Sequence, residues 1–219
     1  MKKIVIFGLG QIAELTFDLA QQIDDIKVEA FTAHKKHIIS NQFLNLPVYS
    51  IEEIKGKINC DDYYFITAIS YKNLNENREQ IYKKLKESNF RFTNIIHPSS
   101  ICRFDTIGEN NIIFELNNFQ KGVSIGNNCI FWSSNHIGHH SKISDNCFFS
   151  SHVVISGSVV LKENSFFGVN SSVRDNVSVG KKCVIGANSL ILKDIPDYSI
   201  IKSKATEISK VKSTMLNKR

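Results

Sequence analysis

The feature that most constrains the fold is a period of six residues in the C-terminal half of the chain. Stepping by six from residue 101 to residue 191 meets a large apolar side chain at every position. A second column, two residues before each of these from residue 123 to residue 189, is mostly small. The large column is Ile101, Ile107, Ile113, Phe119, Ile125, Phe131, Ile137, Ile143, Phe149, Ile155, Leu161, Phe167, Val173, Val179, Ile185 and Ile191.

This period predicts a left-handed parallel β-helix of hexapeptide repeats. Three hexads form one triangular coil, in which the large residue points inward and the small one fits the narrower space beside it. The left-handed winding is an exception to the usual right-handed crossover rule, and the regular period supports it. Fifteen steps of six give about five coils without a long insertion. Glycine often follows the large residue, and we expect glycine or asparagine at corners that favour a positive φ.

Residues 1–96 follow a different pattern, that of a small Rossmann-like α/β domain. KKIVIFG at 2–8 is a continuous apolar run, as in a strand buried on both faces, and residues 11–23 have helical spacing. Further strands are expected at 27–33 and 61–70, a helix at 75–88, and a short closing strand at 90–96. This alternation predicts a small parallel sheet with helices on both faces. The expected domains are therefore 1–96, 97–204 for the β-helix, and a basic tail at 205–219.

Composition excludes several classes of protein. The chain has 219 residues, 42% hydrophobic and 22% charged, which is ordinary for a soluble globular protein. No apolar run approaches the roughly 20 residues that span a membrane, and the N-terminus lacks a cleavage-like site. We therefore expect a cytoplasmic protein without a membrane partner. Five cysteines without paired spacing argue against a disulfide framework.

The net charge of +6 comes largely from the C-terminal tail. From residue 202 onward the chain carries six Lys or Arg against one Glu. Nucleic-acid binding would require basic residues on one face of a recognisable module, which this tail does not provide. We expect a solvated tail and no nucleic-acid partner, with a surface that attracts anionic nucleotides as the alternative.

The period also assigns a direction to the polar and reactive side chains. Cys129, Cys147 and Cys183 fall in the inward small column, which predicts packing residues with thiols of raised pKa. Four of the seven histidines lie between residues 136 and 152, and the register turns all four outward. They are His136, His139, His140 and His152.

Three interpretations of these histidines stay open: a solvated surface, a metal site, or a general base. A zinc site needs three or four converging ligands, whereas His139 and His140 are adjacent in a turn and no outward acid or cysteine is near. We therefore expect no metal. An imidazole can take a proton from an amine or hydroxyl while that group attacks a thioester carbonyl. A smooth prism offers no deep pocket, so we expect a homotrimer with active sites between subunits.

The chain resembles the bacterial nucleotide-sugar acyltransferases of the sialic-acid O-acetyltransferase type. The resemblance rests on GLGQIAE at 8–14 together with the hexapeptide repeat, and it extends to about residue 204. This group includes N-acetyltransferases of UDP- or dTDP-linked amino-sugars. It implies a trimer that uses acetyl-CoA, with the nucleotide-sugar held by the N-terminal domain and CoA along the prism between subunits.

The resemblance also implies roles for single residues. In GHHSKISD, at 138–145, His139 takes the position of the catalytic histidine, and His140 stands where an acidic residue usually follows. A second histidine of the family, associated with the acyl-CoA, falls on Phe148, and His152 is the nearby substitute. An asparagine of the family falls on Trp132, with Asn135 or Asn117 as replacements. The backbone N–H near Gly157 matches the thioester contact. The segment KDIPDYSIIKSKA, from Lys193, matches an exit segment associated with CoA, but its final Gly and Pro are replaced by Ser203 and Lys204.

The glycine turn GLGQIA at 8–13 joins a strand to a helix. Such a turn lets a phosphate approach a helix N-terminus, but the acidic residue that NAD needs is absent from FTAHKKH at 31–37. By resemblance, Gly8, Gly10 and Gln11 contact a nucleotide-sugar instead. Four polar side chains at the C-terminal end of the strand at 61–70 are further nucleotide contacts or, equally, solvated residues at a helix start: Ser70, Tyr71, Asn77 and Arg78.

The sequence thus predicts an acetyl-CoA-dependent N-acetyltransferase of a nucleotide-linked amino-sugar for surface glycan synthesis, with direct transfer and His139 as general base. Two alternatives remain. One is O-acetylation of a sugar hydroxyl, which uses the same base. The other is a non-catalytic scaffold that binds sugar nucleotides.

Overall fold

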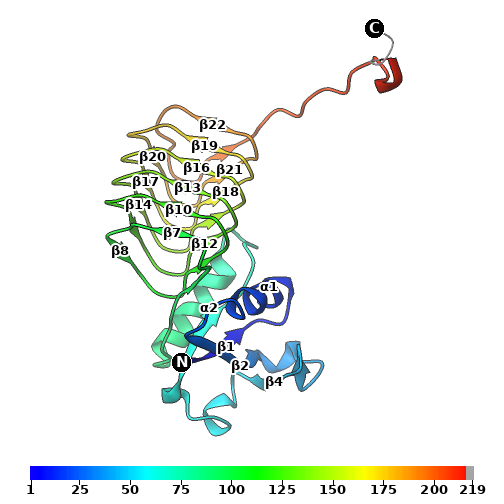
Figure 1. Ribbon diagram of the computed structural model, residues 1–219, viewed down its shortest axis with the longest axis vertical. Coiled ribbons are helices and arrows are strands. Elements are labelled where there is room, and N and C mark those ends of the chain that lie inside the picture. Colours follow the sequence, from blue (N-terminus) through cyan, green and yellow to red (C-terminus); the bar gives the residue numbers. More distant parts are fainter. Residues whose placement is uncertain (216–219) are drawn as a thin grey trace.

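The structure is a computed structural model that describes residues 1–215. A small α/β part lies at one end, and a three-sided prism of stacked coils rises from it (Figure 1). The predicted fold class, an α/β sheet followed by a left-handed parallel β-helix, is confirmed.

The α/β part is a five-stranded sheet in the order β3-β4-β2-β1-β5. The strands run parallel except β3, which pairs antiparallel with β4. Alternate residues of β1 face opposite sides, so that Ile4 and Ile6 pack with α1 and Val5 and Phe7 with α2. The bounds are β1 (Lys2–Phe7), α1 (Gln11–Ala20), β2 (Ile26–Ala33), β3 (Gln42–Phe43), β4 (Leu46–Ser50), β5 (Tyr63–Thr67) and α2 (Glu76–Glu87), with single 3₁₀ turns at Lys35–His37, Ile54–Gly56 and Cys60–Asp62.

The prism has three parallel sheets of two-residue strands, one on each side. The first sheet faces the α/β part and contains β6 (Ile95–Ile96), β9 (Ile112–Ile113), β12 (Ile130–Phe131), β15 (Phe148–Phe149), β18 (Phe166–Phe167), β21 (Val184–Ile185) and β23 (Ile200–Ile201). The second contains β7 (Ile101–Cys102), β10 (Asn118–Phe119), β13 (His136–Ile137), β16 (Val154–Ile155), β19 (Ser172–Val173) and β22 (Leu190–Ile191). The third contains β8 (Thr106–Ile107), β11 (Ser124–Ile125), β14 (Lys142–Ile143), β17 (Val160–Leu161) and β20 (Ser178–Val179).

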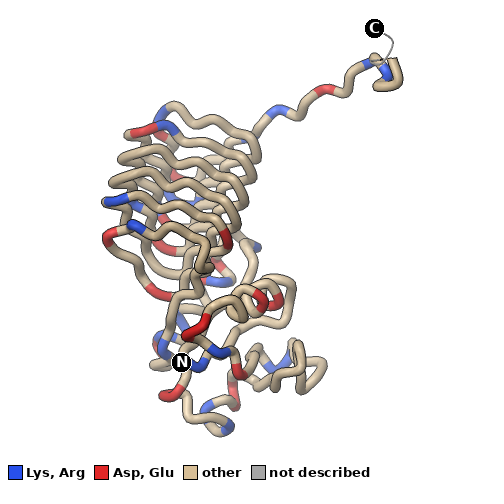
Figure 2. Tube along the Cα trace, viewed as in Figure 1, with Lys and Arg blue, Asp and Glu red and all other residues tan. Residues whose placement is uncertain are grey.

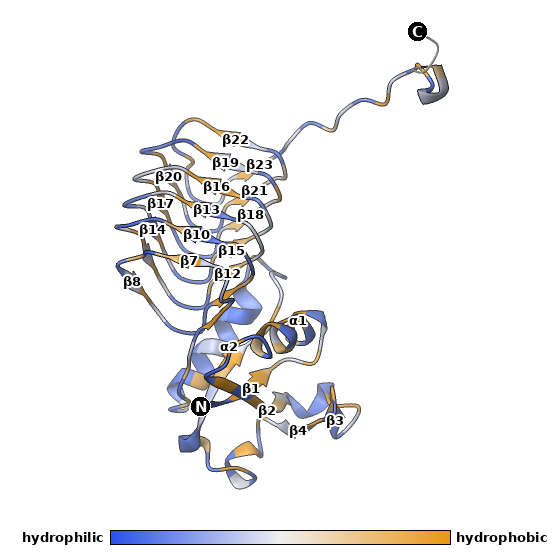
Figure 3. Cartoon of the chain, viewed as in Figure 1, coloured by the Kyte–Doolittle hydropathy of each residue, from blue (hydrophilic) through white to orange (hydrophobic). Residues whose placement is uncertain are grey.

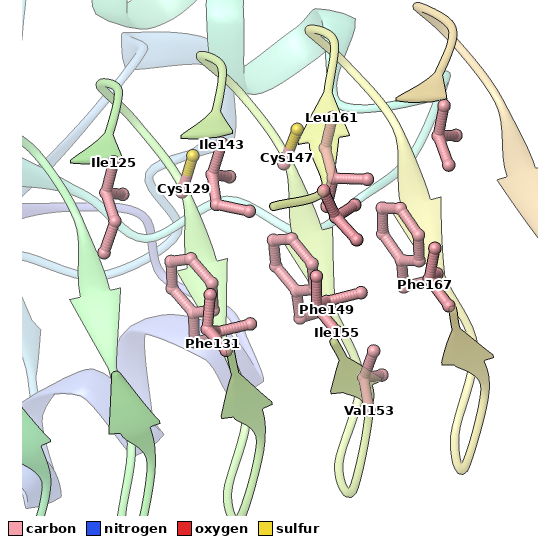
Figure 4. Packing of buried hydrophobic residues seen from close by; sticks show 14 of the residues in the cluster. Ile125, Cys129, Phe131, Ile143, Cys147, Phe149, Val153, Ile155, Leu161 and Phe167 are labelled. Atoms are coloured by element: carbon pink, nitrogen blue, oxygen red, sulfur yellow. The ribbon is translucent and has the colours of Figure 1, made fainter. Parts of the chain in front are cut away.

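The predicted inward columns form the prism core. Every large residue of the column from Ile113 to Ile191 is buried, and so is every residue of the small column. Figure 4 shows neighbouring coils contributing one ring each, and the rings of Phe131, Phe149 and Phe167 stack at centroid distances of 4.5 and 4.9 Å. Each buried large side chain contributes roughly 1.5–3 kcal/mol. The strands are accordingly the apolar bands of the prism, between hydrophilic corners (Figure 3).

The inward cysteines are packing residues, as predicted. Cys129, Cys147 and Cys183 are buried in the prism core and form no disulfide bond. Burial raises the pKa of the Cys129 and Cys183 thiols. Each thiol donates to a carbonyl oxygen of the next coil, which keeps it a structural group.

The prediction of inward side chains is wrong for the first residue of the large column, Ile101. Ile101 pairs with Asn118, an outward position, and is 50% exposed. The first coil is one residue short, since Ile95 also pairs with Ile112, seventeen positions later. Because the side-chain direction alternates along a strand, one missing residue turns Ile101 outward. The strand expected at 90–96 is likewise divided, since Phe92 bridges to Phe65 but Ile95 and Ile96 already belong to the prism.

The corners do need a positive φ, but glycine rarely supplies it. The left-handed residues repeat every six positions, and asparagine is their commonest type. The glycines that follow the large column serve a different purpose: a Cβ on Gly138 would lie 2.5 Å from the Ser156 carbonyl carbon of the next coil. One corner, the ladder corner, holds Asn110, Asn128, Asn146, Asn164 and Lys182; the histidine corner holds Gly122, His140, Ser158 and Asn176; the third corner holds Leu116, Ser134, His152, Asn170 and Asn188.

The α/β part packs on the first sheet and on the ladder corner. Outward residues of the first sheet, among them Ile112, Ile130 and Phe148, share one buried cluster with α1 and β1. At the ladder corner the asparagine amides bond to one another from coil to coil, as Asn110 Nδ2 to Asn128 Oδ1 at 2.8 Å and Asn128 Nδ2 to Asn146 Oδ1 at 2.7 Å. The two parts are therefore joined by an apolar contact and a polar ladder.

Beyond the prism, residues 202–215 run as an extended, exposed segment that ends in a 3₁₀ turn at Ser213–Met215 (Figure 1). Its Lys residues are separated along the chain by a single acidic one (Figure 2). Residues 216–219 of the expected basic tail lie outside the described residues. Within residues 1–215, no helix is both long enough and apolar enough to span a membrane.

Candidate active site

His139 follows β13 and lies at the start of the histidine corner, exposed to solvent. Its backbone N–H donates to Gln120 Oε1 at 2.9 Å, which anchors the turn to the coil below. Its imidazole lies directly against Gly157 of the coil above, where an added Cβ would stand 2.5 Å from both Cε1 and Nε2. Any larger residue at position 157 would clash with the ring, so the imidazole can lie there only because residue 157 is glycine.

His140 is the next residue and has a left-handed backbone, with φ of 58°. Its ring lies over Gly122 of the coil below, where an added Cβ would be 2.7 Å from Cδ2. The two imidazoles meet edge to face, and their Nδ1 atoms are 3.1 Å apart. Although the two residues are adjacent in a turn, their rings converge, contrary to the divergence that adjacency suggests.

Gly157 is a buried residue against the His139 ring, and its backbone N–H is a possible donor there. At this corner a backbone N–H can be capped by a side chain from nineteen positions earlier, as Gln120 caps His139. The residue nineteen positions before Gly157 is Gly138, which has no side chain. Within residues 1–215, the Gly157 N–H donates to no acceptor. The site thus pairs an imidazole with an amide donor that has no intramolecular partner.

Lys193 lies in line with these residues. Positions 139, 157, 175 and 193 are one coil apart, and the strands that precede them pair in register up to β22. With strands about 4.8 Å apart, Lys193 stands roughly 14 Å along the prism from His139. It is exposed at that position. A long ligand lying along this corner would pass His139, Gly157 and Lys193 in turn.

Phe148 is not available to a cofactor, which corrects the expectation for it. Its side chain is 2% exposed and packs between the prism and the α/β part, edge-on to Tyr71 at 4.9 Å and stacked on Phe166 at 5.5 Å. His152 is exposed but lies at the third corner, away from the histidine corner. The structure therefore separates both from His139.

A shallow pocket of about 330 Å³ adjoins His139. Its lining is basic and amide-rich, and its apolar wall is the exposed Ile101 of the short first coil. The residues that line it are Ile101, Arg103, Asn118, Gln120, Lys121 and His139.

The glycine turn after β1 lies between two larger pockets, of about 500 and 760 Å³, which share Gly8, Leu9 and Gly10. The larger one gathers residues that are far apart in the sequence: Gln11, Ser70, Tyr71 and Trp132. The other holds Asn77 together with His34, His37, Gln80 and Lys84. The predicted glycine-turn residues therefore do lie together at one edge of the sheet.

The turn itself suits an anionic group. Gly8 has φ of 135°, and a Cβ there would be 2.7 Å from the Ala68 carbonyl oxygen, so only glycine fits. Gly10 precedes α1 and offers no side chain to cap the first N–H groups of that helix. A helix N-terminus left open in this way attracts phosphate.

Two of the predicted ligand contacts are instead structural. Arg78 is fully buried and donates to main-chain carbonyls of Ile69, Asn128, Asn146 and Cys147, so it is neither a nucleotide contact nor solvated. Burial lowers the pKa of its guanidinium to about 10.

Asn135 is the second. It is 1% exposed, its Nδ2 donates to the Trp132 carbonyl, and its Oδ1 accepts from the Val153 N–H. Asn117, one coil below, is bonded in the same way. Both amides are buried in the prism, so neither is exposed to a substrate.

Three residues of the site were not predicted: Gln120, Gly122 and Gly138. A step of one coil, eighteen residues, from His140 would have found Gly122, whereas Gln120 lies one position further, nineteen before His139. Within residues 1–215, no group of three or more His, Cys, Asp or Glu is placed to hold a metal ion.

Solved structures share this architecture over almost its whole length. The acetyltransferase domain of PglB from Neisseria gonorrhoeae, solved with acetyl coenzyme A, matches with a TM-score of 0.80 at 19% identity, covering 91% of this chain and 95% of that one. A histidine variant of perosamine N-acetyltransferase from Caulobacter crescentus, solved with CoA and GDP-perosamine, matches with a TM-score of 0.79 at 20% identity, covering 91% and 93%. WeeI from Acinetobacter baumannii matches with a TM-score of 0.79 at 15% identity, covering 91% and 96%.

The chain has the fold of these acetyltransferases. No protein-family model and no curated protein sequence matches it. At these identities the likeness establishes the fold.

Proposed function

We propose that the protein is an acetyl-CoA-dependent N-acetyltransferase that acts on a nucleotide-linked amino-sugar. The observation that carries the proposal is the His139 imidazole packed against Gly157, whose N–H has no hydrogen-bond partner within residues 1–215. Acyl transfer from a thioester needs a base for the incoming nucleophile and a donor for the oxyanion, and these two groups supply both. Structures of the same fold contain acetyl-CoA in one case and CoA with GDP-perosamine in another.

The reaction follows from the two groups. The sugar amine attacks the thioester carbonyl carbon, and the resulting oxyanion is held by the Gly157 N–H. His139 Nε2 takes a proton from the attacking nitrogen and returns it to the sulfur as the C–S bond breaks. The products are the N-acetyl sugar and CoA, without a covalent enzyme intermediate.

The co-substrates occupy different parts of the molecule. Acetyl-CoA lies along the histidine corner, with its thioester at Gly157 and its remainder toward Lys193. The nucleotide-sugar binds across the glycine turn, with its phosphates at the start of α1 and contacts from Ser70, Tyr71 and Trp132. Asn77 contributes from the neighbouring pocket.

These positions require more than one copy of the chain. Trp132 follows a strand of the first sheet and His139 a strand of the second, so they stand at different corners of the prism. The pockets that contain them share no lining residue. A homotrimer with active sites between subunits would bring the glycine-turn pocket of one copy to the histidine corner of the next.

The test is a CoA-release assay with product mass, using acetyl-CoA and a panel of GDP-, UDP- and dTDP-linked 4-amino-sugars beside their 4-hydroxy counterparts. We expect acetylation of an amine and a fall in kcat of roughly 10²–10⁴-fold in His139→Ala, the usual loss of a general base. Calorimetry should show acetyl-CoA binding in both proteins. Near-normal turnover in His139→Ala would overturn the assignment of the base, and acetylation of the hydroxy-sugars alone would make the protein an O-acetyltransferase. Absence of acetyl-CoA binding would make it a non-catalytic scaffold.

A further inference from the structure

We propose that His140, as a neutral imidazole, is the positioning residue that holds His139 in its basic form. It accepts a hydrogen bond from Nδ1–H of His139 and thereby leaves Nε2 of His139 unprotonated and facing the substrate. This inference rests on the proposed function, since it assigns a role within that reaction.

The geometry supports a direct hydrogen bond between the two rings. The Nδ1 atoms are 3.1 Å apart, which is within hydrogen-bond distance, and the rings meet edge to face at 78°. Each ring rests on a glycine of a neighbouring coil, His139 on Gly157 and His140 on Gly122. The two imidazoles are therefore held from opposite sides, and their contact is built into the prism.

The tautomers follow from the contact. Only one of two facing Nδ1 atoms can carry the shared hydrogen. If His139 carries it, its Nε2 has a free lone pair and can act as a base; His140 then carries its own hydrogen on Nε2. If His140 carries it, His139 is protonated on Nε2 and cannot accept a proton from the amine. The proposed reaction therefore requires the first arrangement.

Groups around the pair are consistent with an imidazole in this role. Among residues 1–215, no carboxylate lies within hydrogen-bond distance of either ring. Arg103 and Lys121 line the pocket beside His139, and the carboxylate of Asp105 accepts a hydrogen bond from the Gly122 N–H, beneath the His140 ring. When His139 becomes an imidazolium, its Nδ1–H makes a stronger, charge-assisted bond to the neutral His140.

The backbone of His140 provides clean variants. Its left-handed φ is one that glycine and asparagine adopt readily, and Gly122 and Asn176 occupy the same corner. His140→Gly removes the acceptor without backbone strain. His140→Asn keeps one, because Oδ1 of asparagine takes the place of Nδ1. Asn170→Gly, at an exposed left-handed position of the third corner, is the matched control for glycine at a corner.

In steady-state kinetics, His140→Gly should lower kcat by roughly 10- to 100-fold, the loss expected for a missing hydrogen bond to a charged group. The KM values for acetyl-CoA and the sugar should change less than about threefold, because His140 touches neither. His140→Asn should recover most of the kcat, and Asn170→Gly should match wild type. A His140→Gly enzyme with wild-type kcat, or a His140→Asn enzyme as impaired as His140→Gly, overturns the proposal.

A second measurement is independent of turnover. Nitrogen-15 NMR of the imidazoles in the resting protein, assigned with single-histidine variants, should show His139 protonated at Nδ1, His140 at Nε2, and a scalar coupling across the two Nδ1 atoms. A spectrum that shows His139 protonated at Nε2 would overturn the proposal even if the enzyme is active. If no acceptor is acetylated but the predicted tautomers and coupling are found, the proposed function fails and the imidazole pair stands.

Discussion

The ladder corner and the histidine corner have the same backbone and opposite chemistry. Both place a residue in the left-handed region once per coil, and both carry polar side chains there. At the ladder corner Asn110, Asn128 and Asn164 are buried, with their amides bonded to the next coil or to the α/β part. At the histidine corner His139 and His140 are exposed, and the N–H of Gly157, a buried residue against the His139 ring, has no acceptor within residues 1–215.

The difference shows that the covering element, rather than the repeat, decides what a corner does. Where α2 and β5 lie against the prism, an unpaired polar group would cost about 1–3 kcal/mol, and the ladder amides there are bonded, although Asn75 Nδ2 at the start of α2 has no partner within the described residues. Where no part of this chain covers the corner, exposed donors and acceptors such as the imidazoles of His139 and His140 carry little cost and stay available to a ligand. Stability and reactivity are thus divided between two edges of one regular solenoid.

Removing Arg78 should give the largest effect on the ladder side. Arg78→Met deletes a guanidinium bonded to four main-chain carbonyls and to Asn75 Oδ1, and leaves those acceptors buried. We expect a loss of about 3–5 kcal/mol in the free energy of unfolding, measured by urea denaturation. Arg174→Met, at an exposed arginine of the prism, is the control and should unfold like wild type. Equal stability of the two variants would mean that Arg78 does not join the two parts.

Gly157→Ala should give the largest effect on the histidine side after loss of His139 itself. The new Cβ would stand 2.5 Å from the imidazole and push it aside. A displacement of this size typically costs roughly 100-fold in rate, so kcat should fall by about that factor while thermal unfolding changes little. Gly56→Ala, where a Cβ meets no atom within 4 Å, serves as the matched substitution and should leave kcat unchanged. A fully active Gly157→Ala enzyme would place the chemistry elsewhere.

A matched pair of asparagines compares the two corners directly. Asn128 and Asn176 have nearly the same φ, 58° and 60°, but Asn128 is buried in the ladder and Asn176 is exposed. Asn128→Ala should therefore destabilise the protein by about 2 kcal/mol more than Asn176→Ala, since only the first leaves buried partners unbonded. Urea denaturation of both variants measures the difference. Equal losses would show that the backbone, not the amide ladder, sets the cost.

The smallest effect should be a pH dependence at the end of the ladder. Burial raises the pKa of Glu79, but hydrogen bonds from Lys83 and Asn164 outweigh it, so the pKa is lowered overall. A carboxyl whose pKa is lower in the folded state stabilises the protein above its unfolded pKa, and this contribution is lost as the pH falls through the folded value. Glu79→Gln should therefore be slightly less stable than wild type at pH 7. The gap in urea midpoint should narrow as the pH falls below about 4. A difference in urea midpoint that does not change with pH would show that the charge of Glu79 does not stabilise the fold.

Much of the fold could be predicted because the inward register of a hexapeptide repeat is strict. From Ile113 onward every inward residue is where the period of six places it. The prediction that Ile101 points inward was wrong because the first coil is one residue short. The period of six does not reveal the missing residue, since position 101 still holds an apolar side chain. The period therefore predicts the interior well and its ends poorly.

The outward faces were harder to predict than the interior because a period of six does not distinguish the three sides of the prism. A step of eighteen separates them: outward positions of the first sheet are apolar, as at Ile130, Phe148 and Phe166, whereas those of the third include Ser124 and Lys142. That contrast marks the covered side, and it explains why Phe148 is buried.

The misassigned polar residues have the same cause. The sequence predicts Arg78 as a ligand contact or a solvated residue, because it does not show that main-chain carbonyls of the prism accept hydrogen bonds from this guanidinium. It offers Asn135 as a replacement for a family asparagine, although Asn135 belongs to the inward small column, where its amide bonds the neighbouring coils.

The most direct test of the account is the place where acetyl-CoA binds. A crystal structure of the wild-type protein with a non-cleavable acetyl-CoA analogue should show the carbonyl oxygen within hydrogen-bond distance of the Gly157 N–H. The acetyl carbon should face His139 Nε2, and the pantetheine arm should run along the histidine corner toward Lys193. An analogue bound at the glycine turn of Gly8 and Gly10, with the histidine corner empty, would contradict the account.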